Sequence, residues 1–179
     1  LLNMINIVVG PMFSGKTTTM IKRINESMLL GNRVLTIQWE SDNRSGNTKN
    51  HNGLSIPGLI MKTKNLGELQ KKMDKYDLIC IDDAHFFTDL LDFSLFNKDK
   101  NILVCGLDTD YLQNSFTNVT ELSKIADTYV KLQGVCGISS CNDPSIYTIR
   151  TKECKNRLVP GNLDLYLPVC ANHIHIPQM

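Results

Sequence analysis

Short apolar stretches alternate along the chain with segments in which apolar side chains recur every three or four residues. Stretches of the first kind predict buried strands at residues 5–9, 33–37, 78–81, 102–105 and 128–132. Segments of the second kind predict helices at residues 18–30, 66–76, 88–96 and 119–124. Residues 40–53 are polar and rich in turn-forming side chains, which indicates a loop, and residues 54–61 predict a strand interrupted at Pro57. Because strands and helices follow one another in turn, we expect an α/β fold with a mainly parallel sheet and helices on both faces.

The pattern changes near residue 134. Cysteines and turn residues become frequent beyond that point, and no long periodic element follows. A chain of 179 residues corresponds to one domain, or to one domain with a small appendage. We therefore expect an α/β domain at residues 1–133 and a small second domain at residues 134–179.

The segment between the first predicted strand and the first predicted helix has a pattern associated with phosphate binding. It reads Gly10-Pro11-Met12-Phe13-Ser14-Gly15-Lys16-Thr17, which fits G-x-x-x-x-G-K-[ST] without a gap. Between a strand and a helix, the backbone N–H groups of such a loop point toward phosphate oxygens. Lys16 is expected to reach the β- and γ-phosphates of a nucleotide, and Thr17 to hold Mg²⁺ through its hydroxyl. This predicts a phosphate-loop nucleotide-binding fold.

Two carboxylates follow the buried apolar run at residues 78–81. They are Asp82 and Asp83. In phosphate-loop proteins an acid at the end of such a strand holds Mg²⁺, which makes Asp82 the candidate for that role. Asp83 is the candidate general base for a substrate hydroxyl. For the pair considered alone, a solvated strand exit is the alternative interpretation.

Four of the six cysteines lie in the last 45 residues, in a spacing that indicates a metal site. Two pairs, Cys-x4-Cys and Cys-x2-His, stand about 30 residues apart. The expected zinc ligands are Cys136, Cys141, Cys170 and His173. Zinc binds four such groups tetrahedrally in a closed structural site, which leaves no open position for catalysis. Cys154 and His175 are competing donors, and a degenerate site with free thiols is the alternative.

Composition and charge exclude several other classes of protein. The net charge is only +1, so nothing in the composition favours nucleic acid or an anionic membrane as a partner. No apolar run approaches the length of a spanning helix, and no secretory signal is evident, so we expect a cytoplasmic protein. A helicase fragment is disfavoured because the chain is too short for two motor domains and has no strongly basic face.

Several segments together resemble the type II thymidine kinases, the family of cellular cytosolic enzymes and of large DNA viruses. The phosphate loop is the most specific of them, because it carries Pro-Met-Phe inside the general pattern. The other matching segments lie at residues 81–87, 104–111, 130–136 and 166–170. They occur in the family's order and close to its spacing, so the resemblance covers essentially the whole chain. It implies transfer of the γ-phosphoryl group of ATP to the 5′-hydroxyl of thymidine, for deoxynucleoside salvage in DNA synthesis. It also implies a small zinc domain whose lasso-shaped loop covers the nucleoside.

The resemblance also implies roles for individual residues. Asp83 matches the catalytic base of the family, which is normally Glu. Asp42 and Arg44 resemble an Asp-x-Arg loop linked to Mg²⁺ and to phosphate. The residues implied around the nucleoside are Met12, Phe86, Tyr111, Phe116, Thr148, Val159, Gly161 and Tyr166. Of these, Val159 and Gly161 are expected to contact the base through their backbone. Without the resemblance, the aromatic members of this group would be interpreted as ordinary core residues.

The chain departs from the family pattern at three places. Asp83 replaces Glu, Gln113 stands where Arg is common, and the first cysteine pair is widened by two residues. The first two departures leave a second hypothesis open, a nucleotide-binding relative that has lost catalysis and acts as a regulatory or interaction protein. The resemblance further implies a homotetramer or homodimer, with feedback by thymidine triphosphate.

Overall fold

The computed structural model describes residues 3–40, 55–152, 156–161 and 163–175. Within these residues one parallel sheet has the strand order β3-β2-β4-β5-β1-β6. Its strands are β1 (Ile5–Val9), β2 (Val34–Trp39), β3 (Leu59–Thr63), β4 (Leu78–Ile81), β5 (Asn101–Gly106) and β6 (Thr128–Lys131). The predicted α/β class with a mainly parallel sheet is therefore confirmed.

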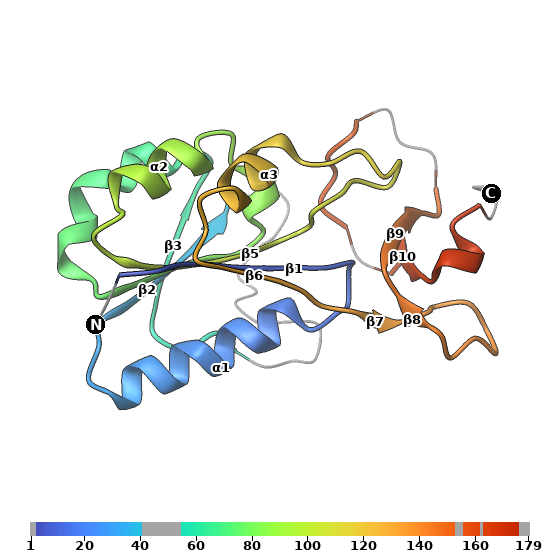
Figure 1. Ribbon diagram of the computed structural model, residues 1–179, viewed down its shortest axis with the longest axis horizontal. Helices are drawn as coiled ribbons and strands as arrows, with labels where there is room; N and C mark the ends of the chain where they lie inside the picture. Colours follow the sequence, from blue (N-terminus) through green and yellow to red (C-terminus); the bar gives the residue numbers. More distant parts are fainter. Residues whose placement is uncertain (1–2, 41–54, 153–155, 162, 176–179) are drawn as a thin grey trace.

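Helices cover both faces of this sheet, as Figure 1 shows. The long helix α1 lies on one face, and α2 and α3 lie on the other. The helical elements of this part are α1 (Lys16–Leu29), η1 (Leu66–Lys75), η2 (Ala84–Phe86), α2 (Leu90–Phe96) and α3 (Thr117–Ser123). None of the helices in the described part of the chain is both long enough and apolar enough to span a membrane.

Two predicted elements differ most from the sequence-based expectation, whereas the bounds of the other predicted elements agree within two residues. The helix expected at residues 66–76 is a 3₁₀-helix, whose start is capped by the Asn65 side chain accepting from the Gly67 N–H. The strand expected from residue 54 begins only at Leu59. Pro57 has no N–H to donate and Gly58 has a φ of 83°, so the chain turns before it can pair.

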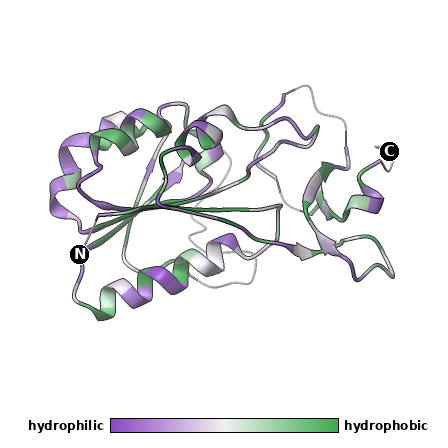
Figure 2. Ribbon diagram, viewed as in Figure 1, coloured by the Kyte–Doolittle hydropathy of each residue, from purple (hydrophilic) through white to green (hydrophobic). Residues whose placement is uncertain are grey.

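A separate hydrophobic core lies on each face of the sheet. Alternate residues of β1 point to opposite faces, so Ile7 and Val9 join one core while Val8 joins the other. The core that contains Val8 also holds Met20 and Ile24 of α1. Hydrophobic residues accordingly concentrate on the central strands in Figure 2, whereas the outer helices carry both hydrophobic and polar residues. Packing of helices against both faces of the sheet holds the carboxyl ends of the strands in fixed positions.

The last part of the chain forms two small antiparallel sheets beyond one end of the main sheet (Figure 1). The elements are β7 (Gly134–Val135), β8 (Pro144–Ser145), β9 (Tyr147–Arg150), β10 (Tyr166–Val169) and η3 (Ala171–His173). A hydrogen bond of 2.9 Å from the Met12 N–H to Thr148 Oγ1 joins β9 to the loop after β1. The division into two domains at residue 134 stays a prediction.

Candidate active site

The loop between β1 and α1 has the backbone shape that its glycines permit. Gly10 has a φ of 151°, and a Cβ there would lie 2.5 Å from the carbonyl oxygen of Leu132, so a larger residue does not fit. Gly15 has a φ of 86° and precedes the first residue of α1. Phe13 also adopts a positive φ, of 61°. The loop therefore turns back on itself directly at the N-terminus of a helix of 14 residues, a geometry suited to phosphate.

Lys16 is the first residue of α1, and its ammonium group folds over the loop. Its Nζ donates to the carbonyl oxygens of Gly10 and Pro11, at 3.0 and 2.6 Å. Desolvation by the surrounding protein lowers the pKa of Lys16, and the negative charges of Asp83 and Asp82 oppose that shift. The loop thus carries a partly desolvated cation close to two carboxylates.

Asp82 and Asp83 take different positions at the end of β4. Asp82 is buried, accepts from Gln38 Nε2 at 3.4 Å, and accepts the Asp83 N–H at 3.1 Å. Burial, reinforced by the charge of Asp83, raises the pKa of Asp82 to about 7. Asp83 has a φ of 51° and a ψ of 39°, a left-handed conformation that turns the chain sharply and places this residue in the wall of a cavity. Aspartate adopts this conformation more readily than most residues.

A cavity of about 160 Å³ brings most of the predicted site residues together. From the sequence-based set it is lined by Met12, Phe13, Gly15, Lys16, Thr17, Asp83, Phe86, Tyr111, Phe116, Thr148, Val159, Gly161 and Tyr166. Gly10, Pro11, Ser14 and Asp82 are not among the residues that line it. Asp42 and Arg44 lie outside the described residues. Five separated segments of the chain therefore converge on one space.

Aromatic rings form one wall of the cavity. Phe86 stacks on Trp39 with ring centroids 5.4 Å apart, and the His85 ring lies 4.3 Å from Phe86 and 5.0 Å from Phe116. His85 Nδ1 accepts the N–H of Leu107 at 3.2 Å, so that nitrogen carries no proton. A rigid apolar wall of this kind suits a flat ring.

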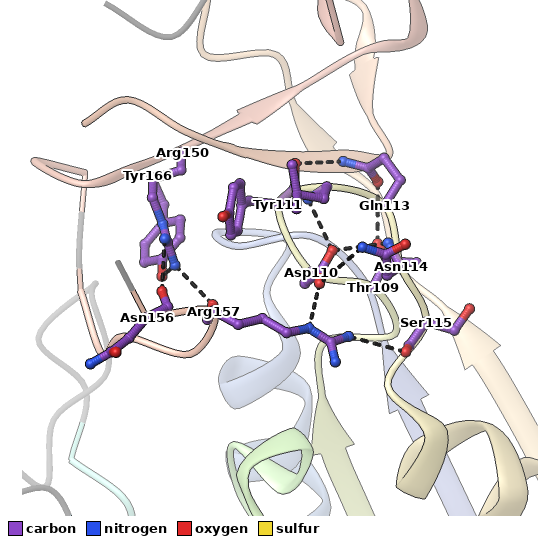
Figure 3. A network of polar contacts seen from close by, with 11 residues as sticks. Thr109, Asp110, Tyr111, Gln113, Asn114, Ser115, Arg150, Asn156, Arg157 and Tyr166 are labelled. Atoms are coloured by element: carbon purple, nitrogen blue, oxygen red, sulfur yellow. Dashed lines mark hydrogen bonds and ion pairs between the residues drawn. The ribbon is translucent and has the colours of Figure 1, made fainter. Parts of the chain in front are cut away.

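Arg150 is a buried residue beside the cavity for which sequence reasoning had no signal. Its guanidinium lies 3.9 Å from the centroid of the Tyr111 ring. It donates to Tyr166 Oη at 3.0 Å and to the backbone carbonyls of Asn156 and Arg157 at 2.9 and 2.8 Å. Figure 3 shows this guanidinium between the strand that carries it and the loop beyond it. A lone arginine in a short strand forms no motif, so only the fold reveals its place.

Gln113, where the resemblance leads one to expect arginine, has a structural task in this chain. It adopts a φ of 66°, and its Nε2 donates to the carbonyl oxygen of Thr148 at 3.3 Å. Its Oε1 accepts from Thr109 Oγ1 at 3.3 Å. Gln113 therefore connects the loop after β5 to β9, next to the Thr148 hydroxyl that contacts Met12. Several cavity residues received no role from the sequence, among them Asp110, Arg157, Leu158 and Pro160, although Asp110 lies in the matching segment 104–111.

Comparison with known proteins agrees with the geometry. The family model for thymidine kinase matches residues 3–174. The chain belongs to the thymidine kinase family. A thymidine kinase of Oryza sativa subsp. japonica is 37% identical over 94% of this chain, which spans 65% of the rice protein. A thymidine kinase of Amsacta moorei entomopoxvirus is 37% identical over 93% of this chain and 94% of the viral protein. A thymidine kinase of Acanthamoeba polyphaga mimivirus is 31% identical over 96% of this chain and 82% of the viral protein. The resemblance seen in the sequence is confirmed.

A second feature of this thymidine kinase family member is a cluster of three thiols and one imidazole at the far end of the molecule. The ligand atoms of Cys136, Cys141, Cys170 and His173 all lie within 4.8 Å of one another. Cys141 Sγ is 3.9 Å from Cys170 Sγ, and His173 Nδ1 is 3.2 Å from Cys170 Sγ and 3.5 Å from Cys136 Sγ. Tetrahedral zinc with Zn–S bonds of about 2.3 Å would place two sulfur atoms about 3.8 Å apart. The cluster thus has the size of a four-ligand metal site.

The widened first cysteine pair is compatible with this cluster. The residues between Cys136 and Cys141 form a turn in which the Cys141 N–H donates to the carbonyl oxygen of Ile138 at 3.0 Å. Ser140 takes a positive φ of 66°, which brings the chain back toward the cluster. Burial disfavours the Cys136 thiolate, but hydrogen bonds from the backbone at Ile138 and Cys170 and from His173 outweigh it and lower the pKa of Cys136 to about 7. The pKa of Cys141 shifts the other way, because a backbone hydrogen bond at Asp143 lowers it but burial and contacts with Cys136 and Cys170 raise it to about 11. The thiolate that metals bind is therefore favoured at Cys136.

Proposed function

We propose that this chain transfers the γ-phosphoryl group of ATP to the 5′-hydroxyl of thymidine. The observation that carries the proposal is the single cavity that has phosphate-loop residues Lys16 and Thr17 on one wall, Asp83 beside them, and aromatic and backbone groups on the remaining walls. Membership of the thymidine kinase family supports the identity of the nucleoside. The wall of Phe86 and Phe116 suits a flat, neutral pyrimidine.

The phosphate end of the cavity is built for charge neutralisation, on which phosphoryl transfer depends most. The loop N–H groups and the ammonium of Lys16 bind the phosphates of ATP. Mg²⁺, when bound, supplies further positive charge, and Thr17 with Asp82 are the described residues that would hold it. The donor set fits this ion, because Mg²⁺ favours carboxylate and hydroxyl oxygens and because burial of Asp82 needs a compensating charge. Asp42 and Arg44 remain proposals for the same phosphates.

Asp83 is the proposed acceptor of the proton from the 5′-hydroxyl. Asp83 lines the same cavity as Lys16, so the attacking oxygen and the phosphate would meet between them. Its left-handed backbone conformation turns the residue out of the line of β4. Backbone strain at such a position is typical of functional sites. The alternative of a relative without catalysis gains no support, because Asp83 lies in the cavity and Gln113 has a structural task.

The nucleoside end of the cavity offers backbone groups and one ordered hydroxyl. Val159 and Gly161 line it, and the Tyr166 hydroxyl donates to the carbonyl oxygen of Val159 at 2.8 Å, which fixes that segment. Thr148 Oγ1 is held by the Met12 N–H. We propose that the base lies between this segment and the aromatic wall, with Tyr111 beside the base and Tyr166 toward the sugar.

The function is tested by phosphate transfer from γ-labelled ATP, with Mg²⁺, to thymidine, deoxyuridine, deoxycytidine and deoxyadenosine. The expected result is labelled nucleotide from thymidine at a rate above that of the other three nucleosides. Stabilisation of the protein against heat by ATP or thymidine, without labelled product, would contradict the proposal and indicate a binding protein instead.

We also propose that the cysteine–histidine cluster holds structural zinc. The cluster joins the end of β10 to the end of β7, because Cys170 follows the first and Cys136 follows the second. A closed site of this type contributes directly to folding. Its position beyond the cavity agrees with a role in holding β9 and β10, which carry Thr148 and Tyr166, rather than in the chemistry.

Replacing Cys170 with Ser is expected to remove the bound zinc and to lower the melting temperature. A loss of one kcal/mol lowers the melting temperature of a protein of this size by about 2–4 °C, and the effect here should exceed that because one ligand of a closed site is gone. The measurements are zinc content by elemental analysis and thermal unfolding. His175→Ala is the control, since His175 is an exposed imidazole outside the cluster. Full zinc content in Cys170→Ser would contradict the ligand assignment.

Assembly, regulation and location are proposals carried by the family alone. We propose a homotetramer or homodimer, feedback by thymidine triphosphate and a cytoplasmic location. Gel filtration at the 20.2 kDa of one chain would contradict the first of these.

A further inference from the structure

We infer that Asp110 and Arg157 act together as a clasp that positions residues 158–161 over the nucleoside end of the cavity. Within the proposed function, both are positioning residues for the nucleoside. The two side chains come from segments 47 residues apart in the sequence, the loop after β5 and the segment between β9 and β10. Figure 3 shows the two side chains in contact, and both residues line the cavity.

Asp110 is the buried half of the clasp. Its side chain is 1% exposed, and its Oδ1 accepts the N–H groups of Leu112 and Asn114, both at 2.9 Å. Its Oδ2 accepts from Arg157 Nε at 2.5 Å. One oxygen therefore orders the turn that carries Tyr111, and the other binds the cation. A carboxylate buried to this extent is costly without a charged partner, so the pair is held firmly.

Arg157 is fixed at both its side chain and its backbone. Its Nη2 donates to the carbonyl oxygen of Ser115 at 3.3 Å, and its guanidinium lies 5.2 Å from the centroid of the Phe116 ring. Its own carbonyl oxygen accepts from Arg150 Nη2 at 2.8 Å. Arg157, which directly precedes residues 158–161, is thus anchored to the loop after β5 through its side chain. Its backbone carbonyl anchors it to β9.

The residues that follow Arg157 have fewer means of holding themselves in place. Leu158, Val159, Pro160 and Gly161 all line the cavity, and none of them carries a polar side chain. They are held by the clasp at one end, by the Tyr166 hydroxyl at Val159 and by close packing of Gly161 against Leu165 and Tyr166. Loss of the clasp should therefore weaken nucleoside binding. The phosphate loop is a separate segment of the cavity lining, so ATP binding should not change.

The test is steady-state kinetics of the full chain carrying Arg157→Gln, Asp110→Asn or both. We expect KM for thymidine to rise about tenfold in either single variant, the size expected for loss of one charge-assisted hydrogen bond. KM for ATP and kcat should stay within about twofold, a split that general destabilisation would not give. The double variant should match the single ones, because both remove the same interaction. Arg33→Gln is the matched control, since Arg33 pairs with Asp77 on the surface, outside the cavity.

An unchanged KM for thymidine in Arg157→Gln and in Asp110→Asn, or additive effects in the double variant, would overturn the clasp while leaving the proposed function intact. If the wild-type chain phosphorylates no nucleoside, the proposed function fails. The contact between Asp110 and Arg157 is then tested by amide hydrogen exchange of the free protein. The clasp predicts faster exchange at Leu158, Val159 and Gly161 in Arg157→Gln than in Arg33→Gln. Equal exchange in the two variants would overturn it.

Discussion

Asp83→Asn is expected to lower kcat for thymidine phosphorylation by about 10²–10⁴-fold, the usual contribution of a general base. The reason is that the amide cannot accept the proton of the 5′-hydroxyl. Asparagine suits this position structurally, because Asn and Asp are the non-glycine residues that adopt a left-handed backbone most readily, and Asp83 has a φ of 51°. The fold and the affinity for ATP should therefore persist, so that the loss of rate reports on chemistry alone.

The measurement is kcat at saturating ATP, together with thermal stabilisation by ATP as a check on binding. Asp92→Asn is the control, because Asp92 is an exposed aspartate of α2 and does not line the cavity. Asp83→Glu tests the reach of the carboxylate and should recover part of the rate that Asp83→Asn loses. A wild-type rate in Asp83→Asn would show that the proton acceptor is another group.

The second large effect is expected for Lys16→Met, which should lower kcat/KM for ATP by about 10²–10³-fold. Removing one preorganised donor from developing negative charge typically has an effect of this size. The melting temperature should not fall. Desolvation lowers the pKa of Lys16, so the charged side chain reduces the free energy of unfolding, and methionine removes that charge. Loss of activity without loss of stability would identify a residue selected for function.

Steady-state kinetics and thermal unfolding together test this prediction. Lys22→Met is the matched control, since Lys22 lies on the same helix with a side chain that is 77% exposed. An unchanged kcat/KM for ATP in Lys16→Met would contradict the phosphate-loop assignment. A large drop in melting temperature would show instead that the two hydrogen bonds of Nζ to the loop carbonyls outweigh the desolvation of the charge.

The main sheet could be predicted from the sequence because its signals are local. A run of four apolar residues at Leu78–Ile81 gives β4 with the bounds expected, and residues 5–9 give β1. The phosphate loop was predictable for the same reason, since its glycines are required by positive φ angles within one segment. The cysteine–histidine cluster was predictable from ligand spacing, even with the first pair widened.

The nucleoside side of the cavity was predictable only through the resemblance. The β9–β10 hairpin joins strands of four residues each, Tyr147–Arg150 and Tyr166–Val169, which are too short for periodicity to indicate. The clasp of Asp110 and Arg157 depends on where two distant loops meet, which no local pattern records. The role of the buried Arg150 guanidinium likewise depends on the two tyrosine rings beside it, which come from distant parts of the chain.

The central claim is that thymidine occupies the cavity with its 5′-hydroxyl toward Asp83 and the phosphate loop. Its most direct test is identification of the product by ³¹P NMR and mass spectrometry after incubation of the full chain with thymidine, ATP and Mg²⁺, beside the same reaction with Asp83→Asn. We predict thymidine 5′-monophosphate from the wild-type chain, and the same product formed about 10²–10⁴-fold more slowly by Asp83→Asn. Phosphate on the 3′-hydroxyl, or no nucleotide product from the wild-type chain, would contradict the claim.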